Sequence, residues 1–299
     1  MKIGMVGLGR MGSGMTRRLE AHGHEVATYD PKVPSTARSL RALATQLEPP
    51  RHVWVMVPSG RITERTVARL LDLLEPGDTI VEGGNSNFRD SQRRYKEARR
   101  QRVSFLDVGV SGGVWGFEVG FCLMVGGDRG PARRLRPVFE ALAPENGWAH
   151  VGPAGAGHFV KMVHNGIEYG LMQAYAEGFE LMYHSDLDLD LTEIAGIWRY
   201  GSVVRSWLLE LLHASFDRYG AGLDDIAGYV EDSGEGRWTI NTAIDEAIPT
   251  PVLAASLFAR FASRRDVNFA AKVAAALRNQ FGAHAVRAVE AAKRGPDAR

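Results

Sequence analysis

The sequence contains a single cysteine, Cys122, and no apolar run long enough to cross a lipid bilayer. One cysteine excludes an intrachain disulfide framework and a cysteine-rich zinc site, and it suits a reducing compartment. A membrane span would need about 18 to 20 consecutive apolar residues. The N-terminus runs straight into strand-like residues and glycines, without the longer apolar stretch and cleavage site of a signal peptide. We therefore expect a cytoplasmic protein.

An excess of charge of either sign is also lacking. The 299 residues include 36 Lys and Arg against 35 Asp and Glu, a formal net charge of +1. This balance argues against nucleic acid or a membrane surface as the main partner. The locally basic stretch 89–102 is interpreted as the solvated face of a helix. With 45% hydrophobic residues, the chain can bury the core of one large or two ordinary domains.

Short β-rich runs alternate with helix-length stretches through the first half of the chain. The runs are bounded by Gly, Pro, Asn or Asp and cover residues 2–6, 24–29, 52–57, 78–82, 104–108 and 121–125. Continuous apolar segments such as 53–57 are typical of strands covered on both faces. Strand–helix alternation predicts right-handed crossovers and a mostly parallel sheet. The expected fold class is an α/β doubly wound sheet.

The glycine-rich string from Gly152 to Gly157 marks a change in the character of the chain. Strand signals largely stop after it, and the second half is rich in Ala, Leu, Glu and Arg at helical spacing. We therefore predict an α/β domain over residues 1–155 and an all-α domain over residues 156–299.

A glycine-rich hexapeptide lies directly after the first predicted strand and opens a helix. It fits the pattern G-x-G-x-x-G and consists of Gly7, Leu8, Gly9, Arg10, Met11 and Gly12. The glycines permit a tight turn and close approach of a pyrophosphate, and the helix N-terminus offers amide donors to the phosphates. Its position after a strand, with an acidic residue some 20 residues on, strengthens an otherwise weak signal. The first domain is thus predicted to be a Rossmann-type dinucleotide-binding domain.

The acidic residue is Asp30, at the end of the second predicted strand. A carboxylate there accepts hydrogen bonds from a ribose 2′-hydroxyl and repels a 2′-phosphate, so it favours NAD over NADP. Pro31 follows in place of an arginine, although the flexible Lys32 could partly compensate. Two further loops follow predicted strands, and their candidate cofactor-binding residues are Val57, Pro58, Ser59 and Asn85. The alternative is that all of these residues serve only turns.

Polar groups that could perform chemistry gather at two places. The loop after strand 104–108 offers backbone amides and a hydroxyl to a substrate through Ser111, Gly112 and Gly113. At about 100° per residue, one helical face would present Lys161, His164, Asn165 and Glu168. A lysine beside a nicotinamide can act as a general base when burial lowers its pKa, and a carboxyl could supply the opposite proton transfer. The alternative is a surface stripe of salt bridges in which the histidine only packs.

Arg278 and His284 bring a guanidinium and an imidazole near the end of the chain. A spacing of six residues does not align them on one unbroken helix, and Gly282 could end or bend the helix between them. The alternative is a pair of surface charges at a helix end.

Together these motifs resemble those of the 6-phosphogluconate dehydrogenase family, within the β-hydroxyacid dehydrogenase superfamily, over essentially the whole chain. The matching segments are 7–12, Gly83-Gly84-Asn85-Ser86, 107–113, 161–169, Phe258-Ala259-Arg260 and Phe281-Gly282-Ala283-His284. Segment 161–169 distinguishes this family from the wider superfamily, which commonly has asparagine where this chain has His164. The chain length is similar to that of the family's short form.

The resemblance implies a cofactor domain followed by an all-helical domain, and no metal. It implies that Lys161 is the general base and later a general acid, while Glu168 protonates an enediol intermediate. The implied substrate-binding residues are Asn85, Ser111, Gly112, Gly113, His164, Asn165, Tyr169, Arg260, Arg278 and His284, with the two arginines on a phosphate. Because Arg278 and His284 would come from a neighbouring subunit, the resemblance also implies a homodimer or homotetramer.

Two departures from the long, NADP-using forms of the family bear on function. Asp30-Pro31 stands where those forms carry Asn-Arg, which favours NAD. Ser233, a neutral hydrogen-bonding residue, stands near the position of a phosphate-binding lysine, and the alternatives are a weaker affinity for phosphate or substitution of the lysine by Arg237. The expected reaction is oxidative decarboxylation of 6-phospho-D-gluconate by NAD, giving D-ribulose 5-phosphate and carbon dioxide in the pentose phosphate pathway. The alternatives are a non-decarboxylating β-hydroxyacid dehydrogenase of the 3-hydroxyisobutyrate type and a non-catalytic NAD-binding protein.

Overall fold

The computed structural model describes residues 1–282 and 285–286, and the chain divides into two compact units. The first unit consists of Met1–Glu177 and Ser233–Ala254, and the second contains Gly178–Asp232 and the described chain from Ala255 onward. The chain therefore passes from one unit to the other three times. The domain boundary between residues 155 and 156 stays a prediction.

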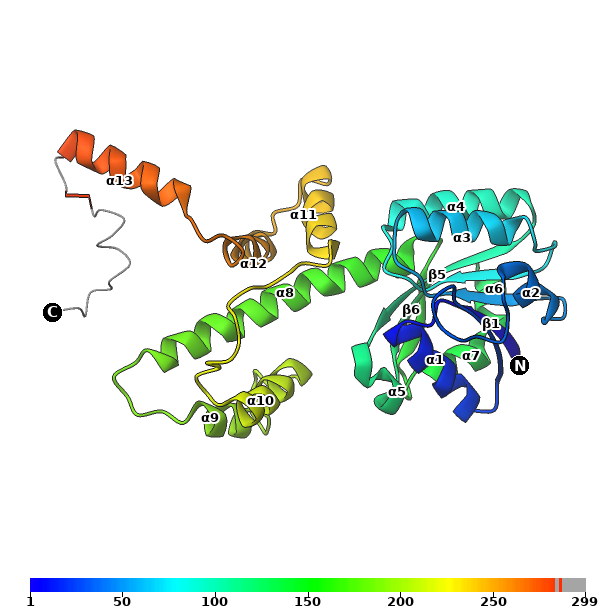
Figure 1. Cartoon of the computed structure of the whole chain (residues 1–299), viewed down its shortest axis with the longest axis horizontal. Helices are drawn as coiled ribbons and strands as arrows, with labels where there is room; N and C mark the ends of the chain where they lie inside the picture. Colours follow the sequence, from blue (N-terminus) through cyan, green and yellow to red (C-terminus); the bar gives the residue numbers. More distant parts are fainter. Residues whose placement is uncertain (283–284, 287–299) are drawn as a thin grey trace. The chain divides into compact units, whose positions relative to one another are not determined.

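A seven-stranded sheet forms the centre of the first unit (Figure 1). In chain order the strands are β1 (Lys2–Val6), β2 (Glu25–Tyr29), β3 (His52–Val55), β4 (Thr79–Glu82), β5 (Ser104–Ser111), β6 (Cys122–Gly127) and β7 (Trp148–Gly152). Their order across the sheet is β2-β1-β3-β4-β5-β6-β7, and all neighbouring pairs are parallel except β5 with β6. The predicted Rossmann-type α/β sheet is confirmed.

The sheet is mostly parallel, as predicted, and two of its features were not specified by the sequence. The connection between β5 and β6 holds only the short helices η1 (Gly113–Trp115) and α5 (Gly116–Val119), so β6 returns antiparallel to β5. A parallel crossover needs about a dozen residues or more, and this connection is too short for one. Strand β7 was not predicted, because it lies at the sheet edge and its five residues are only half buried.

Helices cover both faces of the sheet and bury two separate cores. Helices α1 (Arg10–Ala21), α6 (Arg129–Arg134) and α7 (Arg136–Leu142) pack on one face, with Phe139 edge-on to Trp54. The opposite face carries α2 (Leu40–Thr45), α3 (Arg61–Leu71) and α4 (Phe88–Arg100), as Figure 1 shows for α3 and α4. Strands β3 and β4 are buried along their whole length, and coverage on both sides accounts for the consecutive apolar residues 53–55 and 80–81.

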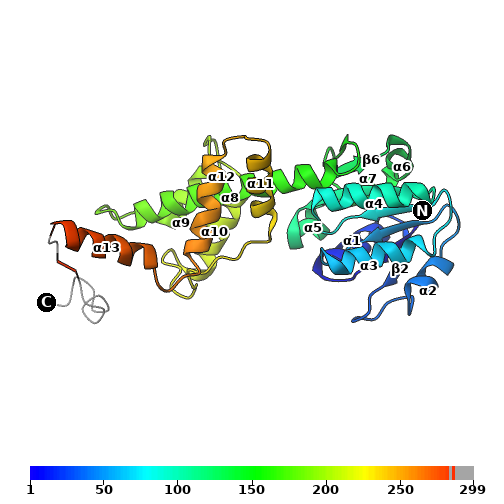
Figure 2. The same cartoon turned by 90° about the horizontal axis from the view of Figure 1, so that it is seen from above.

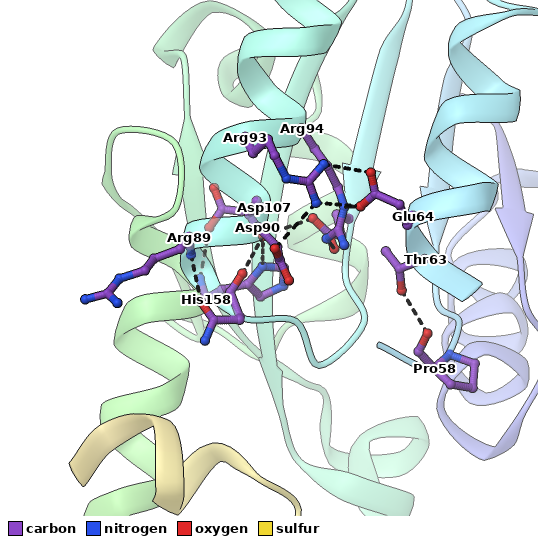
Figure 3. Close-up of polar contacts among 12 residues, drawn as sticks. Pro58, Thr63, Glu64, Arg89, Asp90, Arg93, Arg94, Asp107 and His158 are labelled. Carbon is purple, nitrogen blue, oxygen red and sulfur yellow. Dashed lines mark hydrogen bonds and ion pairs between the residues drawn. The ribbon is translucent and has the colours of Figure 1, made fainter. Parts of the chain in front are cut away.

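The basic stretch 89–102 lies mostly on α4, but the interpretation as a purely solvated face is wrong for Arg94. The Arg94 side chain is 1% exposed and pairs with Glu82 at the end of β4, which is fully buried. Arg94 also donates to Glu64 on α3 at 3.0 Å, and Arg93 donates to both oxygens of the same carboxylate (Figure 3). These arginines lower the pKa of Glu64 to about 2, against the opposing effect of burial. The cluster ties α3 and α4 to the end of β4.

Every element after β7 in the described chain is a helix, which confirms the predicted all-α second part. The helices are α8 (Ala156–Tyr183), α9 (Leu191–Trp198), α10 (Trp207–Tyr219), α11 (Glu235–Asp245), α12 (Pro251–Ala262) and α13 (Phe269–Gly282). In the second unit, Phe179 stacks against Trp198 and Phe216 at centroid distances of 5.6 and 5.5 Å. No helix among residues 1–282 has both the length and the apolar character needed to cross a membrane.

Helix α11 belongs to the first unit although it follows α10 in the chain. It lies against α8 (Figure 2). At this contact the hydroxyl of Thr239 donates to the carbonyl of Met162 at 2.8 Å, and the Thr239 side chain faces Gly166. A Cβ at position 166 would lie 2.8 Å from Thr239, so the glycine is what allows the two helices to approach this closely. The contact brings the start of α11 beside the polar face of α8.

Candidate active site

The glycine loop between β1 and α1 leaves the first turn of α1 open. Gly7 has a φ of 93°, a left-handed conformation that favours glycine, and a Cβ there would collide with the carbonyl of Met56. A Cβ at Gly12 would collide with the Gly7 carbonyl, whereas no atom lies within 4 Å of a Cβ built on Gly9. Gly9 is the N-cap of α1, so free backbone amides border this open space. The loop fits the pyrophosphate of a dinucleotide.

Asp30 follows β2 and lies directly beside this loop. Its Oδ2 accepts a hydrogen bond from the Leu8 amide at 2.8 Å, and its Oδ1 accepts one from the Lys32 amide at 2.7 Å. Burial alone would raise the pKa of Asp30, but hydrogen bonds from the backbone of Leu8, Lys32 and Val33 bring the pKa below its usual value. An ionised carboxylate therefore stands at the end of β2, where a ribose would lie.

The loops after β3 and β4 border the same edge of the sheet. A Cβ on Gly84 would lie 2.6 Å from the carbonyl oxygen of Val57, so the two loops are in close contact. Pro58 is fixed by Thr63, whose hydroxyl donates to the Pro58 carbonyl at 2.9 Å (Figure 3). Ser59 and Asn85 are exposed at this edge. The four loop residues predicted to bind the cofactor thus share the carboxyl end of two neighbouring parallel strands.

Asp107 on β5 fixes the beginning of α8. Its two carboxylate oxygens accept the amide hydrogens of Gly155 at 2.7 Å and His158 at 2.9 Å, satisfying donors that a helix N-terminus leaves without partners. Figure 3 shows Asp107 beside His158. The His158 Nδ1 contacts the Ser91 hydroxyl at 2.8 Å, and Ser91 donates to Glu82 at 3.0 Å. The start of α8 is therefore tied to both β5 and the buried charge cluster.

Two glycines let α8 lie directly on the sheet at the level of Lys161. A Cβ on Gly109 would collide with the Lys161 side chain and lie 2.7 Å from the Gly157 carbonyl oxygen. A Cβ on Gly157 would collide with the carbonyl oxygens of Asp107 and Met124. The lysine side chain consequently leaves α8 across the end of β5, at the edge of the sheet that carries the dinucleotide loop.

Lys161 and its neighbours form a hydrogen-bonded chain along α8. The Lys161 Nζ donates to Asn165 Oδ1 at 2.7 Å, and His164 Nδ1 lies 2.9 Å from the same oxygen. His164 Nε2 is 3.4 Å from the Ser111 hydroxyl, and its Nδ1 is 3.8 Å from Glu168 Oε2. The structure thus brings together four residues predicted on one helical face and a residue of the β5 loop. Gly112 and Gly113 follow Ser111 with φ values of 129° and 55°.

Burial controls the acid–base character of Lys161. Removal from water lowers the pKa of the Lys161 ammonium, and the charges of Glu235 and Glu168, with a smaller contribution from Cys122, oppose this effect. A lysine with a lowered pKa can be neutral at a pH at which an exposed lysine is charged. This is the property that a general base requires.

Glu235 is a member of this cluster that sequence reasoning missed. It is the first residue of α11, is only 3% exposed, and accepts hydrogen bonds from the Asn165 amide and from Ser233 Oγ at 3.3 Å. Burial raises its pKa, and the charge of Lys161 and hydrogen bonds from Asn85, Ser233 and Asn165 oppose the rise. The only signal in the sequence was an acid flanked by glycines, and 70 residues separate it from Asn165.

Tyr169 and Ser233 are paired at the next turn of α8. The Ser233 amide donates to the Tyr169 hydroxyl at 3.0 Å, and the two hydroxyl oxygens are 3.2 Å apart. Of the remaining predicted substrate residues, Arg260 lies on α12 in the second unit and donates to the Glu231 carbonyl at 2.8 Å. Arg278 is exposed on α13, also in the second unit, and His284 lies outside the described residues.

Within residues 1–282 and 285–286, no group of three or more His, Cys, Asp or Glu side chains is arranged to hold a metal ion. The polar groups described above lie instead around the lysine and the open glycine loop. The fold and this arrangement define an NAD(P)-binding oxidoreductase.

Comparisons with known proteins define the family. Residues 2–152 match the NAD binding domain of 6-phosphogluconate dehydrogenase, and residues 157–273 match the 6-phosphogluconate dehydrogenase C-terminal domain. The chain therefore belongs to the 6-phosphogluconate dehydrogenase family, as the sequence motifs predicted.

Three relatives illustrate the range of the similarity. The NAD(+)-dependent, decarboxylating 6-phosphogluconate dehydrogenase of Haloferax volcanii is 42% identical over 297 residues, which is 96% of this chain and 98% of the relative. The Bacillus subtilis protein YqeC, named only provisionally as a 6-phosphogluconate dehydrogenase, is 43% identical over 95% of this chain and 99% of its own. A Plasmodium falciparum 6-phosphogluconate dehydrogenase, solved with NADP+ and with 6-phosphogluconate, is 27% identical with a TM-score of 0.81, covering 98% of this chain and 68% of that chain.

Proposed function

We propose that this protein catalyses the oxidative decarboxylation of 6-phospho-D-gluconate to D-ribulose 5-phosphate and carbon dioxide, with NAD+ as the oxidant. The observation that carries the proposal is the buried, hydrogen-bonded Lys161 at the end of β5, on the edge of the sheet that bears the open glycine loop. The similarity in full length to the Haloferax enzyme supports the same reaction.

The proposed mechanism uses two proton carriers on one helix face. NAD+, when bound, accepts the hydride from C3 of the substrate. Neutral Lys161 takes the proton of the C3 hydroxyl and then, as an ammonium, hydrogen-bonds to the new C3 carbonyl oxygen. That carbonyl accepts the electrons released when the C1 carboxylate leaves as carbon dioxide, and Lys161 returns its proton to the oxygen. Glu168, one turn along α8 from His164, delivers a proton to the enediol carbon that was C2 of the substrate. Lys161 takes back the proton of the hydroxyl on the former C3, which leaves the ketone of D-ribulose 5-phosphate.

Substrate binding is proposed to use the polar groups around this pair. The sugar acid would be held by Asn85, Ser111, Gly112, Gly113, His164, Asn165 and Tyr169. Its phosphate would be held by Arg260 and Arg278, and His284 would reach the substrate as well. Planar guanidinium groups suit a dianionic phosphate because they donate two hydrogen bonds at a time. Ser233 offers a neutral hydroxyl beside Tyr169.

The preference for NAD+ over NADP+ is proposed from Asp30. Its ionised carboxylate lies beside the glycine loop, where it would accept hydrogen bonds from the ribose hydroxyls and repel a 2′-phosphate. The Haloferax relative is NAD(+)-dependent, whereas the Plasmodium relative was solved with NADP+. The residues of this chain favour the first of these two cofactors.

A homo-oligomer, a dimer or tetramer in which Arg278 and His284 serve the site of a neighbouring subunit, is also proposed. The helical part of the chain exposes many large apolar side chains, including Leu181 (76%), Val252 (67%), Phe258 (61%) and Phe269 (71%). Exposed apolar surface of this kind is typical of interfaces between subunits.

The free, exposed Cys122 fits the proposed cytoplasmic location, since reducing conditions keep such a thiol unpaired.

The direct test is an assay with 6-phosphogluconate, run in parallel with NAD+ and NADP+. We expect one NADH and one carbon dioxide per substrate consumed, with NAD+ strongly preferred. The variant Lys161→Met should lower kcat by about 100-fold or more, because it removes the general base. NAD+ binding, measured by calorimetry, should be unchanged in that variant.

The outcomes separate the proposal from its rivals. NADH formation without carbon dioxide would indicate a non-decarboxylating β-hydroxyacid dehydrogenase, and NAD+ binding without turnover would indicate a non-catalytic protein. Retention of a near-normal rate by the Lys161→Met variant would remove the lysine from the mechanism.

A further inference from the structure

Glu235 is a buried carboxylate that the proposed reaction does not use. It opens α11 immediately after Gly234, whose left-handed φ of 92° turns the chain toward α8. Burying a carboxylate is costly unless hydrogen bonds or an opposite charge compensate it. Here both are present, because Asn85, Ser233 and Asn165 hydrogen-bond to it and Lys161 interacts with it electrostatically.

The hydrogen bonds fix the orientation of the Asn165 amide. A carboxylate only accepts hydrogen bonds, so the Asn165 Nδ2 must face Glu235. The other end of the amide, Oδ1, then faces Lys161 Nζ at 2.7 Å. In the flipped orientation, Oδ1 would meet the carboxylate and the amide nitrogen would meet the ammonium, so neither pair could form a hydrogen bond.

The charge of Glu235 acts on Lys161 as well. The groups that face Lys161 are Glu235 on α11, Glu168 on α8 and Cys122 on β6, while His164 shares the Asn165 oxygen. Among the interactions that raise the pKa of Lys161 against burial, the one with Glu235 is the largest. An anion at this place favours the ammonium form of the lysine.

We propose that Glu235 is a positioning residue for Lys161. Glu235 holds the Asn165 amide in one orientation and stabilises the protonated amine of Lys161. The inference rests on the proposed function for the meaning of that protonated state: Lys161 must keep the proton taken from the substrate hydroxyl while the carboxylate leaves. Glu235 touches neither substrate nor cofactor in this account. It acts through Asn165 and through its charge.

Two measurements test the proposal. The first is the pH profile of kcat/KM, whose acid limb reports deprotonation of the general base. The second needs no substrate: the unliganded protein receives a short pulse of acetic anhydride at a series of pH values, and acetylation of Lys161 is read by peptide mass spectrometry. Only the neutral amine reacts, so the midpoint of labelling follows the same proton.

In Glu235→Gln the negative charge is lost, so we expect both midpoints to move to lower pH by about one unit or more. Glu235→Asp keeps the charge but shortens the side chain, and should shift the midpoints less while lowering kcat. Ser233→Ala is the matched control, because it removes a hydrogen bond to Glu235 without removing its charge. It should leave the labelling midpoint in place.

A labelling midpoint that is the same in Glu235→Gln and in the unmodified protein would overturn the proposal, even if the variant were slow or less stable. The test is independent of the reaction assignment. If the unmodified protein fails to oxidise 6-phosphogluconate while the labelling midpoint still shifts in Glu235→Gln, the proposed function fails and the role of Glu235 stands.

Discussion

At the scale of single residues, Asp30 is the group that we propose discriminates between the two nicotinamide cofactors. Replacement by Asn removes the charge but keeps an oxygen that can accept the Leu8 amide. We expect the ratio of kcat/KM for NAD+ to kcat/KM for NADP+ to fall about tenfold or more in Asp30→Asn, because a charge-assisted hydrogen bond and a repulsion disappear together. Steady-state kinetics with both cofactors measure this ratio.

Lys32→Gln is the control for a change of charge in the same loop, since the Lys32 backbone amide, which the substitution keeps, makes the hydrogen bond to Asp30. It should change kcat/KM for NAD+ by no more than about twofold. An unchanged cofactor ratio in Asp30→Asn would show that another group sets the preference.

The sequence predicted residues of the site where local rules apply. Lys161, His164 and Asn165 were expected on one helical face, and in the structure all three meet at one amide oxygen. Their chemical roles stay predictions. Glu235 could not be predicted in this way, since no periodicity connects it to Asn165 across 70 residues, and only the packing of α11 on α8 brings it there.

At the scale of elements, the position of α8 depends on how closely it approaches β5. In Gly109→Ala the new Cβ would collide with Lys161 and lie 2.7 Å from the Gly157 carbonyl oxygen, so α8 must move away from the sheet. We expect a loss of about 1–3 kcal/mol in unfolding free energy. A shift of α8 displaces the amine, so kcat should fall as well. Chemical denaturation and turnover assays measure the two effects.

Gly178→Ala provides a control in α8, the helix that the Cβ of Gly109→Ala would displace. No atom lies within 4 Å of a Cβ built at Gly178, so the substitution meets no obstacle and gains helix propensity. Stability should be equal or slightly higher and turnover unchanged. Equal behaviour of the two alanine variants would contradict the importance of the close approach at Gly109.

Elements were predicted well where burial dictates their pattern and poorly where it does not. Strands β1 to β6 were all located, because short β-rich runs between turn residues identify them. The edge strand β7 was missed and the direction of β6 was not specified, since they depend on sheet position and loop length. Arg94 was misinterpreted because a buried arginine is not distinguishable from its exposed neighbours until its partner Glu82 is known.

At the scale of the whole molecule, the proposed sharing of residues between subunits can be tested by complementation. Lys161→Met and Arg278→Ala should each be nearly inactive alone. If Arg278 serves the site of its neighbour, a dimer of one Lys161→Met chain and one Arg278→Ala chain regains one intact site. Random pairing in a 1:1 co-expression should therefore restore about a quarter of the activity.

Activity measured on the co-expressed, copurified mixture decides whether Arg278 serves the site of a neighbouring subunit. Each variant expressed alone gives the background activity. Absence of recovery, with mixed oligomers demonstrated by differently tagged chains, would place Lys161 and Arg278 in the same subunit's site.

The path of the chain between its two units has a consequence for how such a protein can be divided. The chain leaves the first unit after Glu177 and re-enters it at Ser233. Lys161 and Glu235 therefore come from stretches on either side of the segment Gly178–Asp232, which belongs to the second unit. A truncated protein ending anywhere within that segment would contain Lys161 but lack Glu235. Exchange of the whole first unit between related genes would accordingly have to transfer two separate pieces of coding sequence rather than one.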